Sequence, residues 1–224
     1  MVRADAMRNR ERIREAATVV FRRSGMSTPL DEVAAEAGVS KGTIYHRFTS
    51  RAGLVDAVVE TEIEHRFQRV FDDVMIIQDP GQRLTAYLTR MWQLEYDEPM
   101  VCDVLAQVCP DSTKMQHVCR LASELACRLL TDAQAQGAVR ADLTPADLYH
   151  LLWSVAVALR QGPLPEQHDF LRRCQYQLDG IRWVISAVTA APHDTRAGAP
   201  SPVRTSAKRA ESSRECLTKV ASIG

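Results

Sequence analysis

The chain has 224 residues, of which 46% are hydrophobic and 25% charged, a composition typical of a globular protein with one large or two small domains. The formal net charge of zero, taken alone, argues against a nucleic-acid binder. The charge is unevenly distributed, however, with +3 over residues 1–56, −6 over 57–191 and +3 over 192–224. Basic ends suit contact with phosphate, and an acidic middle would be held away from it.

No targeting segment is predicted, because the first twenty residues are rich in arginine and contain no apolar run before Val19. The longest apolar run, 151–159, contains Ser154 and is far shorter than a membrane span. We therefore expect a cytoplasmic protein with no membrane partner. The six cysteines form no C-x-x-C pair, which favours reduced thiols.

The first predicted helix spans residues 8–24 and follows an unstructured arm at residues 1–7. Gly25 marks its end. Its apolar face contains Ile13, Ala16, Ala17, Val20 and Phe21. Several arginines on the other faces would either track phosphates or simply be solvated.

Two short helices with a turn between them are predicted next. Thr28 is a candidate N-cap followed by Pro29, and Gly38 supplies the left-handed residue that ends the first of these helices. Ser40 then caps a second helix over residues 41–48. Two helices joined by a three-residue turn that contains glycine predict a helix-turn-helix unit, whose second helix enters the DNA major groove.

The residues at the start of the second helix suit DNA contact. Lys41 and the Ser40 and Thr43 hydroxyls are donors, and Gly42 removes side-chain bulk where backbone would approach phosphate. Ile44 would anchor the helix inward. Helix pairs of this kind also serve as plain structure, so these residues alone leave both interpretations open.

The segments RIREAATVVFRRSG, EVAAEAGVSKGTIYHRF and RAGL resemble the N-terminal domain of the tetracycline-repressor (TetR) family. The resemblance implies an all-α protein in which a three-helix helix-turn-helix domain precedes a helical ligand-binding and dimerisation domain. It implies DNA contacts from Thr28, Ser40, Lys41, Gly42, Thr43, Tyr45, His46, Arg47 and Arg51. Arg47 stands where the family usually has an aromatic residue or histidine.

Helical signals continue through the rest of the chain. Ser50 opens a helix to about residue 76, and Asp79-Pro80-Gly81 breaks the pattern. Further helices are predicted over residues 82–96, 99–109, 112–134, 145–160 and 166–188. Beyond residue 191, small and polar residues dominate. We therefore predict three parts: a DNA-binding domain at 1–56, an effector-binding and dimerisation domain at 57–191, and a disordered tail at 192–224.

The stretch 148–159 of the helix at 145–160 is apolar nearly all round, and the last helix has a long apolar face with Leu171 and Trp183 among its members. Such surfaces belong either to an intramolecular core or to a subunit interface. The TetR resemblance implies a homodimer formed by these two helices as a four-helix bundle. A helix-turn-helix reader also normally binds two half-sites.

An effector cavity is expected among the central helices, with a small molecule of unknown identity as its ligand. Candidate lining residues are apolar or polarisable, as pockets usually require: Trp92, Tyr96, Met100, Met115, His117, His150 and Trp153. Each of them would equally suit a helical core. His150 is interpreted as a pocket or core histidine.

No catalytic or metal site is predicted, and no cofactor. His117 and Cys119, two apart on a helix, point about 200° apart, which disfavours joint metal ligation. The pair would need a catalytic neighbourhood to act as a nucleophile and base, and none is readable.

The sequence therefore predicts a ligand-responsive repressor, not an enzyme, that a small molecule releases from a palindromic operator in double-stranded DNA. A helical enzyme with an incidental helix-turn-helix and a ligand-independent architectural DNA binder are the alternatives.

Overall fold

The computed structural model describes residues 2–182, and residues up to Arg182 form one compact unit. Within 2–182 the chain is helical and contains no strand, which confirms the predicted all-α class; Val139 and Arg182 form an isolated β-bridge. The elements are α1 (Val2–Ser24), α2 (Leu30–Ala37), α3 (Lys41–Phe48), α4 (Arg51–Val58), the π-helix η1 (Val59–Ile63), α5 (Glu64–Met75), α6 (Pro80–Asp97), α7 (Pro99–Leu105), α8 (Thr113–Ala135), α9 (Pro145–Gln161) and α10 (Gln167–Ile181).

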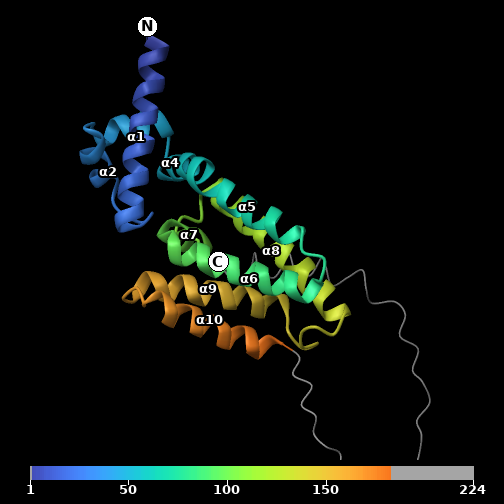
Figure 1. The fold of residues 1–224 in the computed structure, drawn as a ribbon. Coiled ribbons are helices and arrows are strands. Elements are labelled where there is room, and N and C mark those ends of the chain that lie inside the picture. The colour runs from blue at the N-terminus through green and yellow to red at the C-terminus, as the bar shows by residue number, and fades with distance from the viewer. Residues whose placement is uncertain (1, 183–224) are drawn as a thin grey trace, which may run out of the picture. The chain divides into compact units, whose positions relative to one another are not determined.

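The first four helices pack around a small apolar core (Figure 1). Ile13 and Phe21 of α1 are buried with Val33 of α2, Ile44 of α3 and Leu54 of α4. The local signals act as predicted. Gly38 is left-handed at φ 61°, and the Ser40 and Ser50 side chains accept hydrogen bonds from the backbone N–H groups three residues later.

Two predictions about this region are wrong. Residues 1–7 are not an arm, because α1 begins at Val2; no glycine or proline interrupts the chain before Gly25, and Arg8 pairs with Asp5 one turn away. Thr28 does not cap α2, which begins at Leu30 without a side-chain cap. Thr28 is buried, and its carbonyl accepts a hydrogen bond from Arg51.

The predicted long helix from Ser50 to residue 76 is continuous but contains a π-helical turn. The Thr61 hydroxyl donates to the carbonyls of Ala57 (2.9 Å) and Val58 (3.3 Å). A side chain that competes for these carbonyls favours a widened turn. The α4–η1–α5 run connects the first helices to the rest of the unit, and its π turn was not visible in the hydrophobic pattern.

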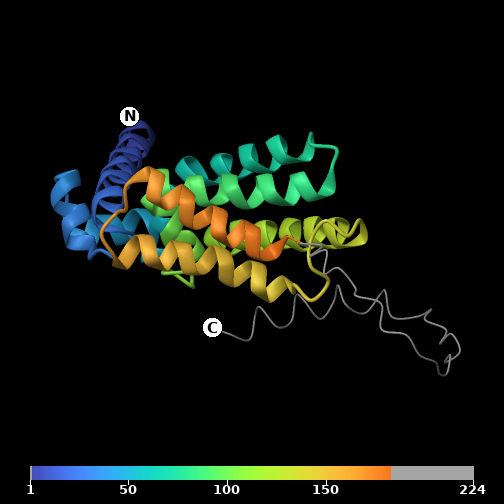
Figure 2. The same cartoon turned by 60° about the horizontal axis from the view of Figure 1, so that its bottom comes forward.

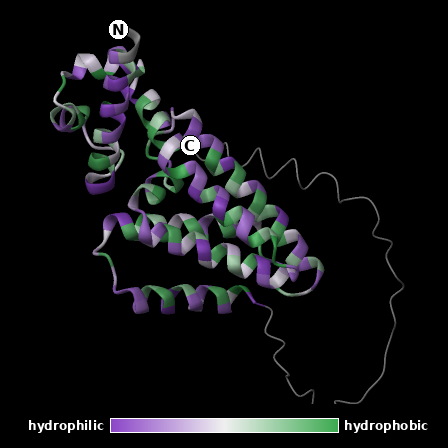
Figure 3. Ribbon diagram, turned by 45° about the horizontal axis from the view of Figure 1, so that its top comes forward, coloured by the Kyte–Doolittle hydropathy of each residue, from purple (hydrophilic) through white to green (hydrophobic). Residues whose placement is uncertain are grey.

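Helix α6 lies at the centre of the remaining helices and contacts α5, α7, α8, α9 and α10 (Figure 2). Its Tyr87 and Trp92 are among the largest fully buried side chains, and the Tyr87 hydroxyl donates to the Ala122 carbonyl of α8 at 3.0 Å. Figure 3 shows polar and apolar residues alternating along these helices, as expected for amphipathic helices.

The ends of the later helices largely follow their predicted signals. Ser112 caps α8, and Thr144 with Asp147 forms a capping box at α9. Helix α7 ends at Leu105 and not at residue 109, because Gln107 adopts a left-handed φ of 52°. The predicted extension of the last helix to residue 188, Trp183 and the predicted tail lie outside the described residues. Within 2–182 no helix is long and apolar enough to cross a membrane.

Candidate nucleic-acid interface and effector region

Most of the predicted DNA-contacting residues lie on α3 or at its N-cap. The Ser40 Oγ accepts a hydrogen bond from the Thr43 backbone N–H at 3.1 Å and lies 2.9 Å from the Thr43 hydroxyl, which orders the start of the helix. Lys41, Gly42, Tyr45 and His46 are exposed, and Ile44 and Phe48 anchor the opposite face in the core. The exposed residues therefore form one polar face around the amino end of α3.

The cation in this face already has a partner. Lys41 Nζ donates to an Asp31 carboxylate oxygen of α2 at 2.8 Å. This hydrogen bond raises the pKa of the Lys41 ammonium and lowers the pKa of the Asp31 carboxyl. A phosphate that binds Lys41 would compete with Asp31, which holds the ammonium in place between the two helices.

Arg47 and Arg51 are half-buried and make contacts within the unit. Arg51 donates to the carbonyls of Met26 and Thr28, the latter at 2.7 Å. The Arg47 carbonyl accepts from Arg10 at 2.7 Å, while the Arg47 Nε is buried without a described partner. Arg51 therefore holds the loop before α2, and Arg10 holds the end of α3. The phosphate contacts of Arg47 and Arg51 remain predictions.

The structure does not bring the seven predicted effector residues together. Trp92, Met100 and Met115 are buried. Tyr96 is half-buried and donates to the Pro165 carbonyl at 2.9 Å. The other three, on α8 and α9, lie at or near the surface: His117, His150 and Trp153.

The interpretation of His150 as a core residue is wrong, and its role in an effector pocket stays a prediction. It is exposed, because α9 turns Leu148 and Leu152 inward and leaves position 150 outside. The His150 ring lies edge-on to Trp153, with centroids 6.3 Å apart.

A shallow apolar hollow lies between α7, α8 and α9. Of the predicted effector residues, only Trp153 lines it. The other lining residues, which sequence reasoning missed, are Leu105, Cys119, Ala122, Ser123, Ala126, Tyr149 and Leu152. They were missed because the hollow depends on the packing of three helices and not on the pattern of any one of them.

The residue that sequence reasoning missed most clearly is Glu95 of α6. It is 1% exposed, and neither carboxylate oxygen has a hydrogen-bonding partner among the described residues. The indole N–H of Trp92, one turn earlier, is also buried without such a partner. A glutamate on the apolar face of α6 was the available signal.

The histidine and cysteine considered for metal ligation have other contacts. His117 Nδ1 lies 2.9 Å from an Arg120 guanidinium nitrogen, and the Cys119 thiol donates to the Val104 carbonyl at 3.2 Å. Among the described residues, no group of three or more potential ligands is arranged to hold a metal ion. Burial raises the pKa of Cys119 to about 12, which makes it a poor nucleophile near neutral pH.

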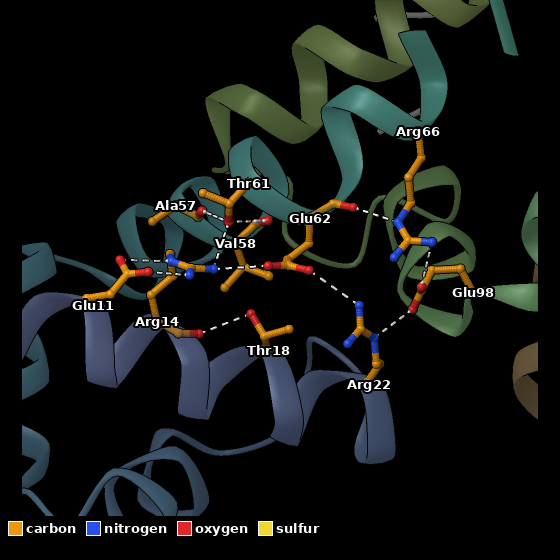
Figure 4. A network of polar contacts seen from close by, with 10 residues as sticks. All are labelled: Glu11, Arg14, Thr18, Arg22, Ala57, Val58, Thr61, Glu62, Arg66 and Glu98. Carbon is orange, nitrogen blue, oxygen red and sulfur yellow. Dashed lines mark hydrogen bonds and ion pairs between the residues drawn. The ribbon is translucent and has the colours of Figure 1, made fainter. Parts of the chain in front are cut away.

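An ion network joins α1 to the connecting helix and to the junction of α6 and α7 (Figure 4). Glu62 of η1 pairs with Arg14 at 3.0 Å and Arg22 at 3.3 Å. Glu98 is buried and pairs with Arg22 at 3.1 Å and Arg66 at 3.0 Å. Arg22 therefore bridges two carboxylates on different elements. A shift at the α6–α7 junction would thus displace Arg22 and with it α1.

A second group of polar contacts, centred on Asp103 and called the Asp103 node below, connects the same regions. The buried Asp103 of α7 accepts a hydrogen bond from the Met26 backbone N–H at 2.8 Å and pairs with Arg160 of α9 at 2.9 Å. Arg160 also packs against Gly25, which has a left-handed φ of 89°; a β-carbon there would lie 1.9 Å from the guanidinium. One carboxylate thus holds the loop before α2, α7 and the end of α9 together.

Comparisons with known proteins agree with this architecture. A family model described as bacterial regulatory proteins, tetR family, matches residues 13–58, and one described as Transcriptional regulator SbtR-like, C-terminal domain, matches residues 79–183. The HTH-type transcriptional regulator UidR of Escherichia coli strain K12 is 21% identical over 196 residues, which cover 85% of this chain and 97% of UidR.

Solved structures show the same fold. The ketosteroid transcriptional regulator KstR2 of Mycobacterium tuberculosis has a TM-score of 0.57 at 22% identity, covering 78% of this chain and 95% of KstR2. RolR in complex with resorcinol has a TM-score of 0.53 at 16% identity, covering 80% of this chain and 89% of RolR. Since both family models describe such regulators and lie in order along one chain, the chain belongs to the TetR family of transcriptional regulators.

Proposed function

We propose that the protein is a homodimeric repressor that acts in the cytoplasm, binds a palindromic operator through two copies of α3, and is released by a small-molecule effector. In this proposal residues 1–56 form the DNA-binding domain, called the head below, and residues 57–191 form the effector-binding and dimerisation domain, called the body. The observation that carries the proposal is the exposed amino end of α3, where an ordered cap, a lysine and two aromatic or imidazole side chains share one face.

The roles of the individual residues follow from their placement. Lys41, Gly42, Thr43 and Tyr45 would address base edges and the adjacent phosphates, because the first residues of a recognition helix lie deepest in the major groove. Ser40 and His46 would fix the register through phosphate contacts. Further phosphate contacts would come from Thr28 in the loop before α2, Arg47 at the end of α3 and Arg51 at the start of α4.

DNA binding is tested with Lys41→Ala. If Lys41 binds phosphate, the variant should lose affinity for all sequences and show a shallower dependence on salt, by a slope of about 1 on a log–log scale. If Lys41 binds guanine, the loss should concentrate at one base pair, at about 1–3 kcal/mol. Binding would be measured on the DNA upstream of the protein's own gene, with footprinting to locate the operator.

Arg128→Ala is the matched control, because Arg128 is an exposed cation of α8 outside the predicted interface. It removes the same charge from the protein and should leave affinity and salt dependence nearly unchanged. Equal losses in the two variants, or no loss in either, would remove Lys41 from the interface.

Dimerisation is supported by apolar side chains that α9 and α10 leave uncovered. Trp153 of α9 is 38% exposed, and Leu171 and Tyr176 of α10 are 43% and 65% exposed. A second copy that packs the same two helices would cover these side chains. Two α3 helices on one dimer would then bind two half-sites of an operator.

Effector response is supported by the contacts that join the head to the body. A ligand among the body helices changes DNA affinity only if it binds better to one arrangement of the two heads. The Asp103 node and the Glu62–Glu98 network provide physical connections for such a change. The complex of RolR with resorcinol shows that a protein of this fold binds a small organic molecule.

Thermal melts across a small-molecule panel separate this proposal from a ligand-independent architectural DNA binder. A sensor should be stabilised by specific compounds, and the same compounds should weaken operator binding. An architectural binder should show neither effect.

A further inference from the structure

Glu95 is an acidic group with no described partner at the centre of the body. Glu95 belongs to α6, and its side chain is buried in the core. Helices α5, α7, α8, α9 and α10 all contact α6. Both carboxylate oxygens are buried and accept no hydrogen bond from the described residues. An unpaired carboxylate in such a place is strongly destabilised relative to one in water. Ionised Glu95 would therefore need a counter-charge or hydrogen-bond donors that the described residues do not supply.

The neighbours of Glu95 do not neutralise it. Titratable groups that interact with Glu95 or its neighbours are Tyr87 of α6, Cys102 and Asp103 of α7, Cys119 and Cys127 of α8, Arg160 of α9 and Cys174 of α10. The cation among them, Arg160, is paired with Asp103. The Tyr87 hydroxyl and the Cys102 thiol already donate to backbone carbonyls. Burial therefore raises the pKa of Glu95 well above its usual range and favours the protonated, neutral acid.

The surroundings of Glu95 supply complementary features. Trp92, three residues earlier and so on the same side of α6, offers a buried N–H without a described partner. A carboxyl group and an indole on one side of a helix are features with which proteins bind organic cations.

We propose that Glu95 and Trp92 recognise the effector and that the effector is a protonated organic amine. An ammonium group supplies both the positive charge and the hydrogen-bond donors that the two carboxylate oxygens lack. Trp92 Nε1–H would donate to an acceptor on the same molecule, and the apolar core would hold its hydrocarbon part. A neutral or anionic ligand could only hydrogen-bond to the protonated acid, and it would supply no counter-charge to the carboxylate. This inference rests on the proposed effector response.

The position of Glu95 also connects a ligand to the DNA-binding head. The Cys102 thiol of α7 donates to the Glu95 carbonyl at 3.3 Å, and the adjacent Asp103 holds the Met26 N–H of the head. Glu95 is closed off in this structure, so an amine enters only when the side chains of α6, α7 and α10 part locally. A displacement of α7 would then act directly on the loop before α2.

Binding of an amine should release a proton. The acid is neutral in the empty protein and must ionise to pair with the ammonium, so affinity should rise with pH until Glu95 is ionised in the empty protein as well. Calorimetry in two buffers of different ionisation enthalpy measures the number of protons released, which should approach about one per protomer. Binding of a neutral ligand at this site requires no such release.

The test uses matched amine and alcohol probes, which differ only in the charged group: 2-phenylethylamine with 2-phenylethanol, tryptamine with tryptophol, and octylamine with octanol. Wild type, Glu95→Gln and the control Glu124→Gln are compared by thermal melt and calorimetry. At least one amine should raise the Tm of wild type and of Glu124→Gln more than its alcohol does. Glu95→Gln should bind that amine about thirtyfold or more weakly and release no proton.

The inference is overturned if no amine stabilises wild type above its alcohol, or if Glu95→Gln binds the amines as well as wild type does. Operator binding distinguishes this failure from that of the proposed function. If neutral or acidic compounds release the protein from DNA while amines do not, the proposed regulatory function is kept and the proposed amine effector is wrong. If the protein binds no operator, or no compound of any class releases it, the proposed function itself fails.

Discussion

At the residue scale, the most consequential side chains are those whose partners come from distant parts of the chain. Arg51 and Arg22 both belong to stretches that favour contact with DNA or solvent, yet they bind a carbonyl or a carboxylate within the unit. Glu95 differs from them because its oxygens have no described partner. The raised pKa of Glu95 makes stability depend on pH.

Glu95→Gln should therefore stabilise the empty protein above about pH 4.3, the pKa of glutamate in an unfolded chain. Because the folded state keeps the proton when the unfolded state has lost it, wild-type stability falls as pH rises through the window between the two pKa values, by about 1.4 kcal/mol per pH unit. The glutamine variant removes this loss. Urea unfolding of both proteins between pH 4 and 8 measures it.

Glu124→Gln is the control, because the half-buried Glu124 of α8 pairs with Arg120, and its stability should change little with pH. If the unfolding free energies of wild type and Glu95→Gln stay parallel across the range, the Glu95 carboxyl has a partner in solution and its pKa is not raised.

At the scale of elements, α7 is short but holds contacts on both sides. Its seven residues begin with Pro99, and the other six are buried, with Cys102 against α6 and Asp103 against the head and α9. A short helix of this kind derives little stability from its own backbone and depends on its neighbours. It is thus the element through which a change in the body would reach α1 and α2.

Asp103→Asn should uncouple the head from the body. Asparagine can still accept from Met26 N–H, but Arg160 loses its counter-charge in a mostly buried place, at a cost of about 1–3 kcal/mol. We expect faster amide hydrogen exchange in residues 22–28 and a weaker effect of effector on operator affinity. Hydrogen exchange with mass spectrometry measures the first, and operator titrations with and without effector measure the second.

Asp142→Asn is the control, because Asp142 pairs with Arg140 at the exposed start of the loop before α9. If the two variants exchange alike, or if Asp103→Asn keeps full effector response, the coupling runs through the Glu62–Glu98 network instead.

For the whole molecule, the proposed mechanism requires two heads held at a fixed spacing. The two helices that would provide this, α9 and α10, retain exposed apolar side chains within the described unit. Their exposure in one copy is what an interface between two copies would remove.

Leu171→Glu should make the protein monomeric without unfolding it. Leu171 is already partly exposed, so a charge costs little in one copy but is buried without a partner in a dimer. Affinity for a palindromic operator should fall by about a hundredfold or more, because the two half-sites no longer bind one molecule. Sedimentation and operator binding on the same sample measure both effects.

Ile76→Glu, at the exposed end of α5, introduces the same charge away from these helices and should stay dimeric. A Leu171→Glu protein that remains dimeric at full affinity would place the interface elsewhere.

The sequence by itself determined the order, type and most boundaries of the helices between residues 8 and 181. Caps such as Ser40, Ser112 and Thr144, and the left-handed Gly38, act within one turn of their own position, and such local interactions are readable without a fold. The same local signals indicated the helix-turn-helix, and the segments that contain them carried the resemblance to the TetR family.

Only the tertiary structure decided which polar groups meet and which do not. The burial of Thr28, the exposure of His150 and the contacts of Asp103 all depend on elements far apart in sequence. Periodicity shows that a helix has an apolar face but not which neighbour covers it. For that reason Glu95 reads as one polar residue on an apolar face, and its isolation becomes visible only when the surrounding helices are in place.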